Sequence, residues 1–139
     1  MREAVTKLEF LGGYRFKVKF DEDSMPDIFV DEEKPIGDGS GPNPARLLSA
    51  AVGHCLSSSL LFCLHKARID TKNIETTVKA NVDRNEEGYL RVKNLDVQIH
   101  VETDEKDRTR LTRCLTIFEN YCTVTESVRK GINVDVNIT

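Results

Sequence analysis

The sequence lacks an excess of positive charge, and it has no long run of basic residues. Of its 139 residues, 20 are Lys or Arg and 23 are Asp or Glu, which gives a net charge of −3. Clustered cations hold a nucleic-acid backbone, so this composition argues against a nucleic-acid partner. A hydrophobic content of 39% and a charged content of 31% exclude collagen-like, low-complexity and disordered chains. We therefore expect a single globular domain over residues 1–139.

Cysteine is scarce, and the common cysteine motifs are missing. Four cysteines are too few for a disulfide scaffold. There is no C-x-x-C pair, and Cys63-Leu64-His65 is not a usual ligand spacing, so no metal is expected. A G-x-S-x-G nucleophile elbow and a phosphate-binding glycine loop are also missing. The start of the chain carries charges where a signal peptide needs an apolar core, which favours a reducing cytoplasm.

Alternating apolar and polar residues predict several antiparallel strands. Gly12-Gly13 supplies a tight turn for the first hairpin, because glycine tolerates the positive φ angles of such turns. Lys93-Asn94 breaks the alternation of the second hairpin and predicts a bulge there. The predicted strands lie in a hairpin over residues 5–20, at residues 28–30, in a hairpin over residues 74–102 turned at residues 85–88, and at residues 132–138.

The central segment is unusually apolar. Residues 47–64 contain no Asp, Glu, Lys or Arg, and Asn43 and Pro44 suit the cap and the first position of a helix. A transmembrane span is the alternative, but the run is barely long enough and holds several small polar residues. We interpret it as a helix buried on all sides. In so small a domain, such burial predicts that a second subunit covers one face.

Two more helices are predicted after the second hairpin. Residues 104–121 have acidic residues in their first turn and an apolar stripe of Leu111, Leu115 and Phe118. Thr123 and Glu126 match a capping box, so a short helix is expected from there to Gly131. Together with the strands, this order of elements predicts an α+β domain.

The four cysteines differ in their local settings. Cys63 and Cys114 have apolar neighbours and are interpreted as small buried hydrophobes. Cys122 precedes a helix, where unpaired N–H groups and the helix dipole favour a thiolate. Cys55 has no such local help and would need a cation from elsewhere in the fold. Cys55 and Cys63 would lie about 12 Å apart on one helix, which is too far for a disulfide.

Two separated segments resemble the signatures of the OsmC/Ohr family, the osmotically inducible and organic hydroperoxide resistance proteins. Residues 41–56, GPNPARLLSAAVGHCL, resemble its central-helix signature. Residues 122–131, CTVTESVRKG, resemble its second signature, a cysteine at the start of a short C-terminal helix, with Thr123 in place of the usual proline. The resemblance implies an OsmC-like fold, in which antiparallel sheets surround a buried central helix. It also implies an intertwined homodimer with active sites at the subunit interface, without metal, haem or flavin.

The resemblance also implies a chemistry for the cysteines. Cys55 would be the peroxidatic thiolate, which attacks an organic hydroperoxide and becomes a sulfenic acid. Cys122 would resolve the sulfenic acid to a disulfide, and a small dithiol or other thiol reductant would restore both thiols. The family uses an arginine of the first hairpin to stabilise the thiolate, and Arg15 is the best match. The alternative is that Arg15 shares a solvated strand face with Lys17 and Lys19.

One position departs from the family pattern. Hydroperoxide-resistance members carry a glutamate after the Asn-Pro, paired with that arginine, whereas this sequence has Ala45. Two functions are therefore expected. The first is a cytoplasmic thiol-dependent peroxidase that reduces organic hydroperoxides through Cys55 and Cys122. The alternative is an OsmC-like dimer that binds a hydrophobic or thiol-bearing small molecule without efficient turnover. Neither function needs nucleic acid or a membrane.

Overall fold

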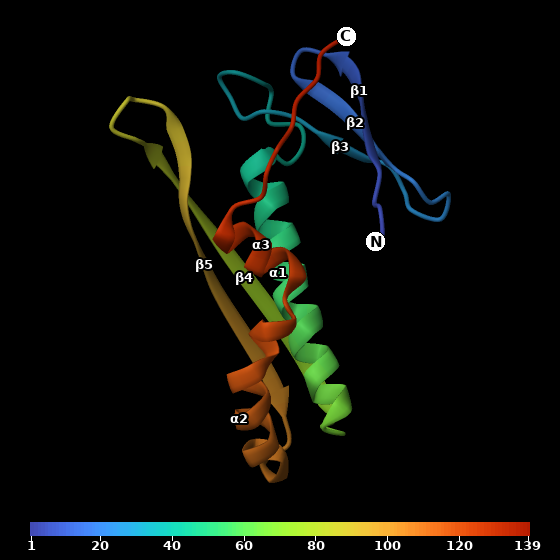
Figure 1. The fold of residues 1–139 in the computed structure, drawn as a ribbon, viewed down its shortest axis with the longest axis vertical. Coiled ribbons are helices and arrows are strands. Elements are labelled where there is room, and N and C mark those ends of the chain that lie inside the picture. The colour runs from blue at the N-terminus through green and yellow to red at the C-terminus, as the bar shows by residue number, and fades with distance from the viewer. The chain divides into compact units, whose positions relative to one another are not determined.

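The computed structural model describes all of residues 1–139, which divide into two compact units, Met1–Leu48 and Ser49–Thr139. Helices and antiparallel sheets both occur, so the predicted α+β class is confirmed (Figure 1). In chain order the elements are β1 (Thr6–Gly12), β2 (Arg15–Phe20), β3 (Ile28–Val30), α1 (Pro44–Lys66), β4 (Thr71–Arg84), β5 (Leu90–Thr103), η1 (Glu105–Asp107), α2 (Arg108–Ile117), η2 (Phe118–Tyr121) and α3 (Thr123–Lys130).

The first unit is built on an antiparallel sheet in the order β1-β2-β3. Gly12 and Gly13, at the turn between β1 and β2, have φ angles of 103° and 58°, which residues with a Cβ rarely adopt. Phe10 and Phe16 are paired across the two strands, with ring centroids 5.7 Å apart. The predicted hairpin and the predicted third strand are both confirmed.

A buried carboxylate organises the loop after β3. Asp31 is 3% exposed. It accepts hydrogen bonds from the backbone N–H groups of Glu32, Asp38 and Ser40 and from the Ser40 hydroxyl, at 2.8 to 3.2 Å. At Gly37 an added Cβ would collide with the carbonyl oxygen of Glu32. This segment therefore has a defined shape without regular secondary structure.

The helix α1 begins as the sequence predicts. Pro44 is its first residue, and the side-chain oxygen of Asn43 accepts a hydrogen bond from the backbone N–H of Arg46 at 3.1 Å. This bond satisfies one of the N–H groups that a helix start leaves free.

In the second unit α1 packs against β4. An added Cβ at Gly53 would lie 2.9 Å from Cγ2 of Val78, and the Ser57 hydroxyl lies 2.6 Å from that of Thr76. By length and composition alone, α1 is long and apolar enough to cross a membrane. Within one chain it is buried on one face only, and Phe62 on the other side is 55% exposed. The expected burial on all sides is therefore not found in a single chain. The buried face consists of Ser49, Val52, Gly53, Leu56, Ser59, Leu60 and Leu64.

The long hairpin of β4 and β5 has the predicted turn and the predicted bulge. Asn81 pairs with Asn94 and Val82 pairs with Val92, so Lys93 is the extra residue on β5. At the turn, Gly88 has a φ of 90°, and its backbone N–H donates to the carbonyl of Asn85 at 3.0 Å. Figure 1 shows this hairpin running alongside α1.

The helix predicted over residues 104–121 is divided into η1, α2 and η2. Its buried side chains are Asp107, Cys114 and Phe118, whereas Leu115 is 45% exposed. The predicted apolar stripe is therefore wrong at Leu115, because the buried residue of α2 is Cys114 and the next residue lies about 100° round the helix from it. Asp107 forms an ion pair with Arg110, one helical turn away.

The end of the chain departs from two predictions. The capping box is wrong, because Cys122 occupies the N-cap of α3 and no side chain caps this helix. Gly131 ends α3 with a φ of 77°, as predicted. The strand predicted over residues 132–138 is not formed, and its four apolar side chains are 63 to 89% exposed. A segment with alternating apolar residues forms a strand only where a neighbouring strand pairs with its backbone. Within one chain no strand pairs with this segment.

Candidate functional site

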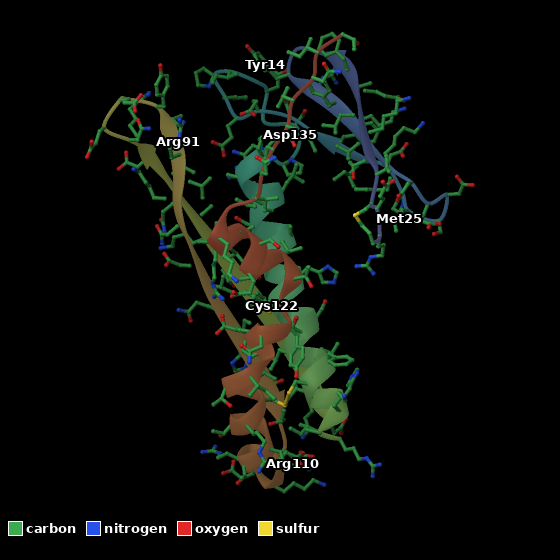
Figure 2. The ribbon with its side chains drawn as sticks, viewed as in Figure 1. Tyr14, Met25, Arg91, Arg110, Cys122 and Asp135 are labelled. Atoms are coloured by element: carbon green, nitrogen blue, oxygen red, sulfur yellow. A yellow bond between two sulfur atoms is a disulfide. The ribbon has the colours of Figure 1, made fainter.

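Cys55 and Cys122 come together although they are far apart in the sequence. Cys55 lies in the middle of α1, and Cys122 immediately precedes α3. The Cys122 sulfur lies 4.0 Å from the carbonyl oxygen of Cys55 and 3.7 Å from that of Phe118. Figure 2 shows Cys122 beside the middle of α1. Both cysteines are free thiols, and Cys122 is buried while Cys55 is partly accessible.

The first turn of α3 lowers the pKa of Cys55. Burial alone would raise the pKa of this thiol. The backbone N–H groups of Thr125 and Val124 donate to its sulfur, and the Thr125 hydroxyl and the Cys122 thiol add further stabilisation of the thiolate. These contacts outweigh burial, so the pKa lies below the usual value for cysteine. The Thr125 hydroxyl is buried and makes no other hydrogen bond.

Cys122 has the opposite shift. Burial raises the pKa of the Cys122 thiol, and a hydrogen bond with Ser59 only partly offsets that effect. The negative charge of the Cys55 thiolate, which Cys122 faces as a hydrogen-bond donor, raises the pKa further. The two pKa shifts have opposite signs, so as pH rises Cys55 loses its proton before Cys122 does.

This arrangement corrects the local argument from the sequence. The N–H groups at the start of α3 were expected to favour a thiolate on Cys122, the adjacent residue. They instead point at Cys55, which receives help from a helix N-terminus far along the chain rather than from a cation. Backbone donors are independent of side-chain identity, so only the packing of α3 on α1 reveals this contact.

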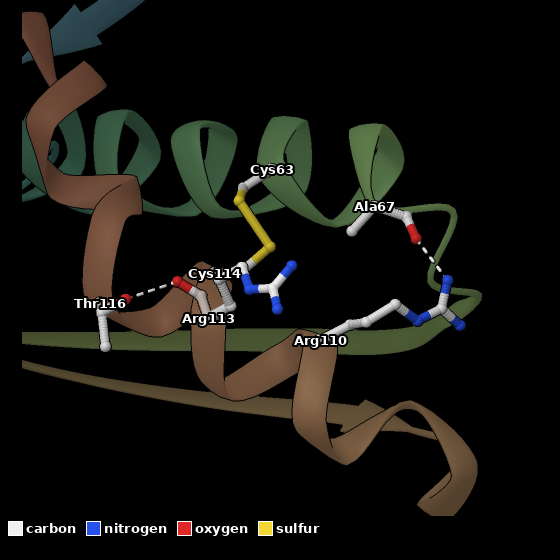
Figure 3. The surroundings of a disulfide bond; sticks show 6 residues. All are labelled: Cys63, Ala67, Arg110, Arg113, Cys114 and Thr116. Carbon is white, nitrogen blue, oxygen red and sulfur yellow. Dashed lines mark hydrogen bonds between the residues drawn. A yellow bond between two sulfur atoms is a disulfide. The ribbon is translucent and has the colours of Figure 1, made fainter.

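The other two cysteines form a disulfide. Cys63 on α1 and Cys114 on α2 are bonded, with Cα atoms 5.8 Å apart (Figure 3). The interpretation of both as separate small hydrophobes is therefore wrong, although Cys114 is indeed buried. A signal was present in the sequence. Cys55 and Cys63 are eight residues apart, as are Cys114 and Cys122, so two antiparallel segments bring both pairs together at once.

The predicted arginine and the missing glutamate both belong to the first unit. Arg15 is the first residue of β2, and its guanidinium donates to the carbonyl oxygen of Leu11 at 3.3 Å. Ala45 lies in the first turn of α1, where it supplies no carboxylate. The adjacent Arg46 forms an ion pair with Glu33 instead. No group of three His, Cys, Asp or Glu side chains in the structure could hold a metal ion.

A family comparison identifies the chain's relatives. A sequence profile described as OsmC-like protein matches residues 37–137, which include all four cysteines. The chain belongs to the OsmC-like family. The match confirms the resemblance to the OsmC/Ohr family that pointed to Cys55 and Cys122. No curated protein matches the sequence.

Solved structures share this OsmC-like fold. An OsmC-like protein of unknown function from Vibrio cholerae is 15% identical with a TM-score of 0.74, and the match covers 91% of this chain and 94% of that one. An organic hydroperoxide resistance protein OsmC from Legionella pneumophila is 16% identical with a TM-score of 0.68, covering 93% and 90%. The organic hydroperoxide resistance protein OhrB of Bacillus subtilis is 21% identical with a TM-score of 0.61, covering 92% and 91%. At these identities the likeness establishes the fold.

Proposed function

We propose that this protein is a thiol-dependent peroxidase that reduces organic hydroperoxides, with Cys55 as the peroxidatic and Cys122 as the resolving cysteine. The observation that carries the proposal is the contact between two free thiols: the buried Cys122 sulfur lies 4.0 Å from the carbonyl oxygen of the partly accessible Cys55. Hydrogen bonds from α3 lower the pKa of Cys55, while burial raises the pKa of the neighbouring Cys122. A thiolate is the nucleophile that peroxide reduction requires. Three similar folds carry the name organic hydroperoxide resistance protein, which is consistent with this chemistry.

The first chemical step uses the partly accessible sulfur. The Cys55 thiolate attacks the terminal oxygen of the hydroperoxide, the O–O bond breaks, and the alkoxide leaves with the electron pair. After protonation the alkoxide becomes an alcohol, and Cys55 becomes a sulfenic acid. The N–H groups of Val124 and Thr125 hold the nucleophile in its charged form before the attack. The apolar side chains of α1 favour an organic peroxide over hydrogen peroxide.

The second step forms the disulfide between the two cysteines. Cys122 loses its proton and attacks the sulfur of the Cys55 sulfenic acid, and water leaves. A small dithiol or another thiol reductant then restores both thiols by exchange. Cys122 is well placed for this step because its sulfur already lies beside the backbone of Cys55.

Arg15 is proposed to stabilise the thiolate and to orient the peroxide. This role rests on the family resemblance, and Ala45 removes the glutamate that would hold the arginine. If Arg15 acts in this way, Arg15→Gln lowers the rate of hydroperoxide reduction by about tenfold or more. Lys17→Gln on the same strand serves as the matched control and leaves that rate unchanged.

The whole molecule is proposed to be an OsmC-like homodimer in the cytoplasm, with residues 1–139 as one domain. The exposed apolar residues of the C-terminal segment, between Ile132 and Ile138, support a second subunit. The family profile spans the boundary between the two compact units, which supports one domain.

The deciding experiment is a titration of free thiols after one equivalent of cumene hydroperoxide. The wild-type protein should lose two thiols rapidly, Cys55→Ser should lose none, and Cys122→Ser should stop at a sulfenic acid that is open to overoxidation. Peptide mapping should find a Cys55–Cys122 bond. If wild type keeps both thiols through a long incubation, the missing carboxylate has disabled turnover. The protein is then the alternative, a dimer that binds a hydrophobic or thiol-bearing small molecule.

A further inference from the structure

The Cys63–Cys114 disulfide lies in the wall of a cavity that the proposed peroxidase reaction does not use. The cavity has a volume of about 380 Å³, and both cysteines line it. Cys114 is 2% exposed, whereas Cys63 is partly accessible. Two exposed aromatic side chains, Phe62 and Tyr121, also line the cavity, at 55% and 60% exposure. A disulfide that borders a cavity is open to attack by a small thiol.

The cavity is positively charged. Lys66, Arg110 and Arg113 line it, and no acidic residue does. Arg110 is occupied, because it pairs with Asp107 and donates to the carbonyl oxygen of Ala67 at 2.6 Å. Lys66 lies over the Phe62 ring, with its nitrogen 5.5 Å from the centroid, and it has no acidic partner among the ion pairs.

Of the cationic residues that line the cavity, Arg113 is the one next to a disulfide cysteine in the sequence. It directly precedes Cys114, its side chain is exposed, and no carboxylate pairs with it. Figure 3 shows its guanidinium on the side of α2 where the disulfide lies. Two cations, Lys66 and Arg113, are therefore available to a ligand at the same cavity.

We propose that this cavity is a thiol–disulfide exchange site for small anionic thiols, in which Cys63–Cys114 is the reacting bond and Lys66 and Arg113 bind the ligand's carboxylate or sulfonate. The proposal does not depend on the peroxidase function, because it concerns a different pair of cysteines. A disulfide in a reducing compartment is usually a redox-active one, and the cytoplasm is the compartment proposed above.

The exchange takes place in two balanced steps. The ligand thiolate attacks the more accessible sulfur, that of Cys63, the bond to Cys114 breaks, and Cys114 leaves as a thiolate that then takes up a proton. A second ligand thiolate attacks the ligand sulfur of the mixed disulfide, which releases the ligand as its symmetrical disulfide. Cys63 leaves and is protonated. Two ligand thiols are oxidised, and one protein disulfide is reduced to two thiols.

The test uses the full chain carrying Cys55→Ser and Cys122→Ser, so that only the second pair reacts. Three monothiols of similar size and different charge are compared at equal thiolate concentration: 2-mercaptoethanesulfonate, 2-mercaptoethanol and cysteamine. Samples are quenched with N-ethylmaleimide, and mass mapping of Cys63 and Cys114 gives the rate of reduction. We expect the anionic thiol to react about tenfold faster than the neutral one at low salt, and this preference to shrink in 1 M salt.

Variants that remove single charges test whether Arg113 and Lys66 cause the faster reaction of the anionic thiol. Arg113→Gln should reduce the rate of the anionic thiol by about threefold, and adding Lys66→Gln should nearly abolish its advantage. The neutral thiol is the internal control for folding, because its rate should stay the same in each variant. Arg108→Gln, on the same helix but paired with Glu105 and outside this cavity, should leave every rate unchanged.

Several results would overturn the proposal. One is an equal rate for all three thiols. Another is the same loss of preference in Arg108→Gln as in Arg113→Gln. The third is aerobically purified protein in which both Cys63 and Cys114 map as free thiols and remain so after treatment with an oxidised small thiol.

Discussion

At the scale of single residues, the reactivity of Cys55 depends on a hydroxyl that sequence reasoning did not select. Thr125 is 5% exposed, and its hydroxyl stabilises the Cys55 thiolate. Replacing it by valine keeps the shape and removes the donor. We expect Thr125→Val to raise the pKa of Cys55. Its rate of alkylation by iodoacetamide at neutral pH should then fall by about threefold, as expected for one lost hydrogen bond.

The direction of the expected change can be read from the pH dependence of alkylation. A thiol becomes reactive as pH rises through its pKa, so the alkylation profile of Thr125→Val should be displaced toward higher pH than that of wild type. Thr123→Val is the matched control, because Thr123 is exposed on the same turn and its side chain does not contact Cys55. An identical displacement in both variants would show that the helix start, and not the Thr125 hydroxyl, had been altered.

A second residue-scale prediction concerns Asp31. The Ser40 hydroxyl is the main contact that lowers the pKa of this carboxyl, followed by backbone N–H groups, while burial opposes the shift. A lowered pKa means that the contribution of Asp31 to stability is complete above the usual aspartate value of 3.8. It is lost as pH falls further, through the folded-state pKa.

The substitution Asp31→Asn should imitate that loss at neutral pH. The amide would place N–H donors against the donors of Ser40 and Asp38, so the midpoint of urea unfolding should fall at pH 7 and change less on acidification than in wild type. Asp38→Asn is the control, because only the backbone of Asp38 takes part in the network. Equal midpoints for wild type and Asp31→Asn would contradict the role given to this carboxylate.

At the scale of elements, the contact between α1 and β4 depends on the missing side chain of Gly53. Alanine favours a helix over glycine by about 1 kcal/mol. Its Cβ would, however, lie 2.9 Å from Cγ2 of Val78, a stiff β-branched side chain. Overpacking costs about 1 to 3 kcal/mol, so Gly53→Ala should destabilise the protein by about 1 kcal/mol in urea unfolding.

A double-mutant cycle checks the stated cause. Val78→Ala removes the colliding methyl groups and leaves a cavity when it is made alone. Combined with Gly53→Ala it should cost less than the two single changes together, since the new Cβ fills part of that cavity. Strict additivity would mean that Gly53 is needed for some reason other than its approach to Val78.

Elements with a local cause could be predicted from the sequence, and those with a distant cause could not. Asn43 caps α1, Gly131 ends α3, and Lys93 is the bulge, each for reasons present within a few residues. The cap of α3 was wrong because Cys122 and not Thr123 holds that position. The donors to Cys55 depend on how α1 meets α3, which periodicity does not encode. For the Cys63–Cys114 bond, the matching eight-residue spacing of the cysteines was a signal, but it does not show that α1 and α2 pack together.

At the scale of the whole molecule, the C-terminal segment predicts association. Ile132, Val134, Val136 and Ile138 are 63 to 89% exposed and alternate like one face of a strand. In a dimer this segment would find the hydrogen-bond partners that it lacks within one chain. Removing residues 132–139 should therefore convert the dimer to a monomer in light scattering coupled to size exclusion. A full-length chain that is monomeric at high concentration would contradict the proposed dimer.

The Cys63–Cys114 bond also makes resistance to proteolysis depend on whether the disulfide is oxidised or reduced. It joins positions 51 residues apart and so encloses the whole β4–β5 hairpin in a covalent loop. Closing a loop of that length restricts the unfolded chain by about 4 kcal/mol in the chain-entropy account. Reduction should therefore make proteolysis of the native protein much faster, as pulse proteolysis with and without reductant can measure. A cell that shifts its thiol balance would thereby set how long this protein persists, with no change in its synthesis.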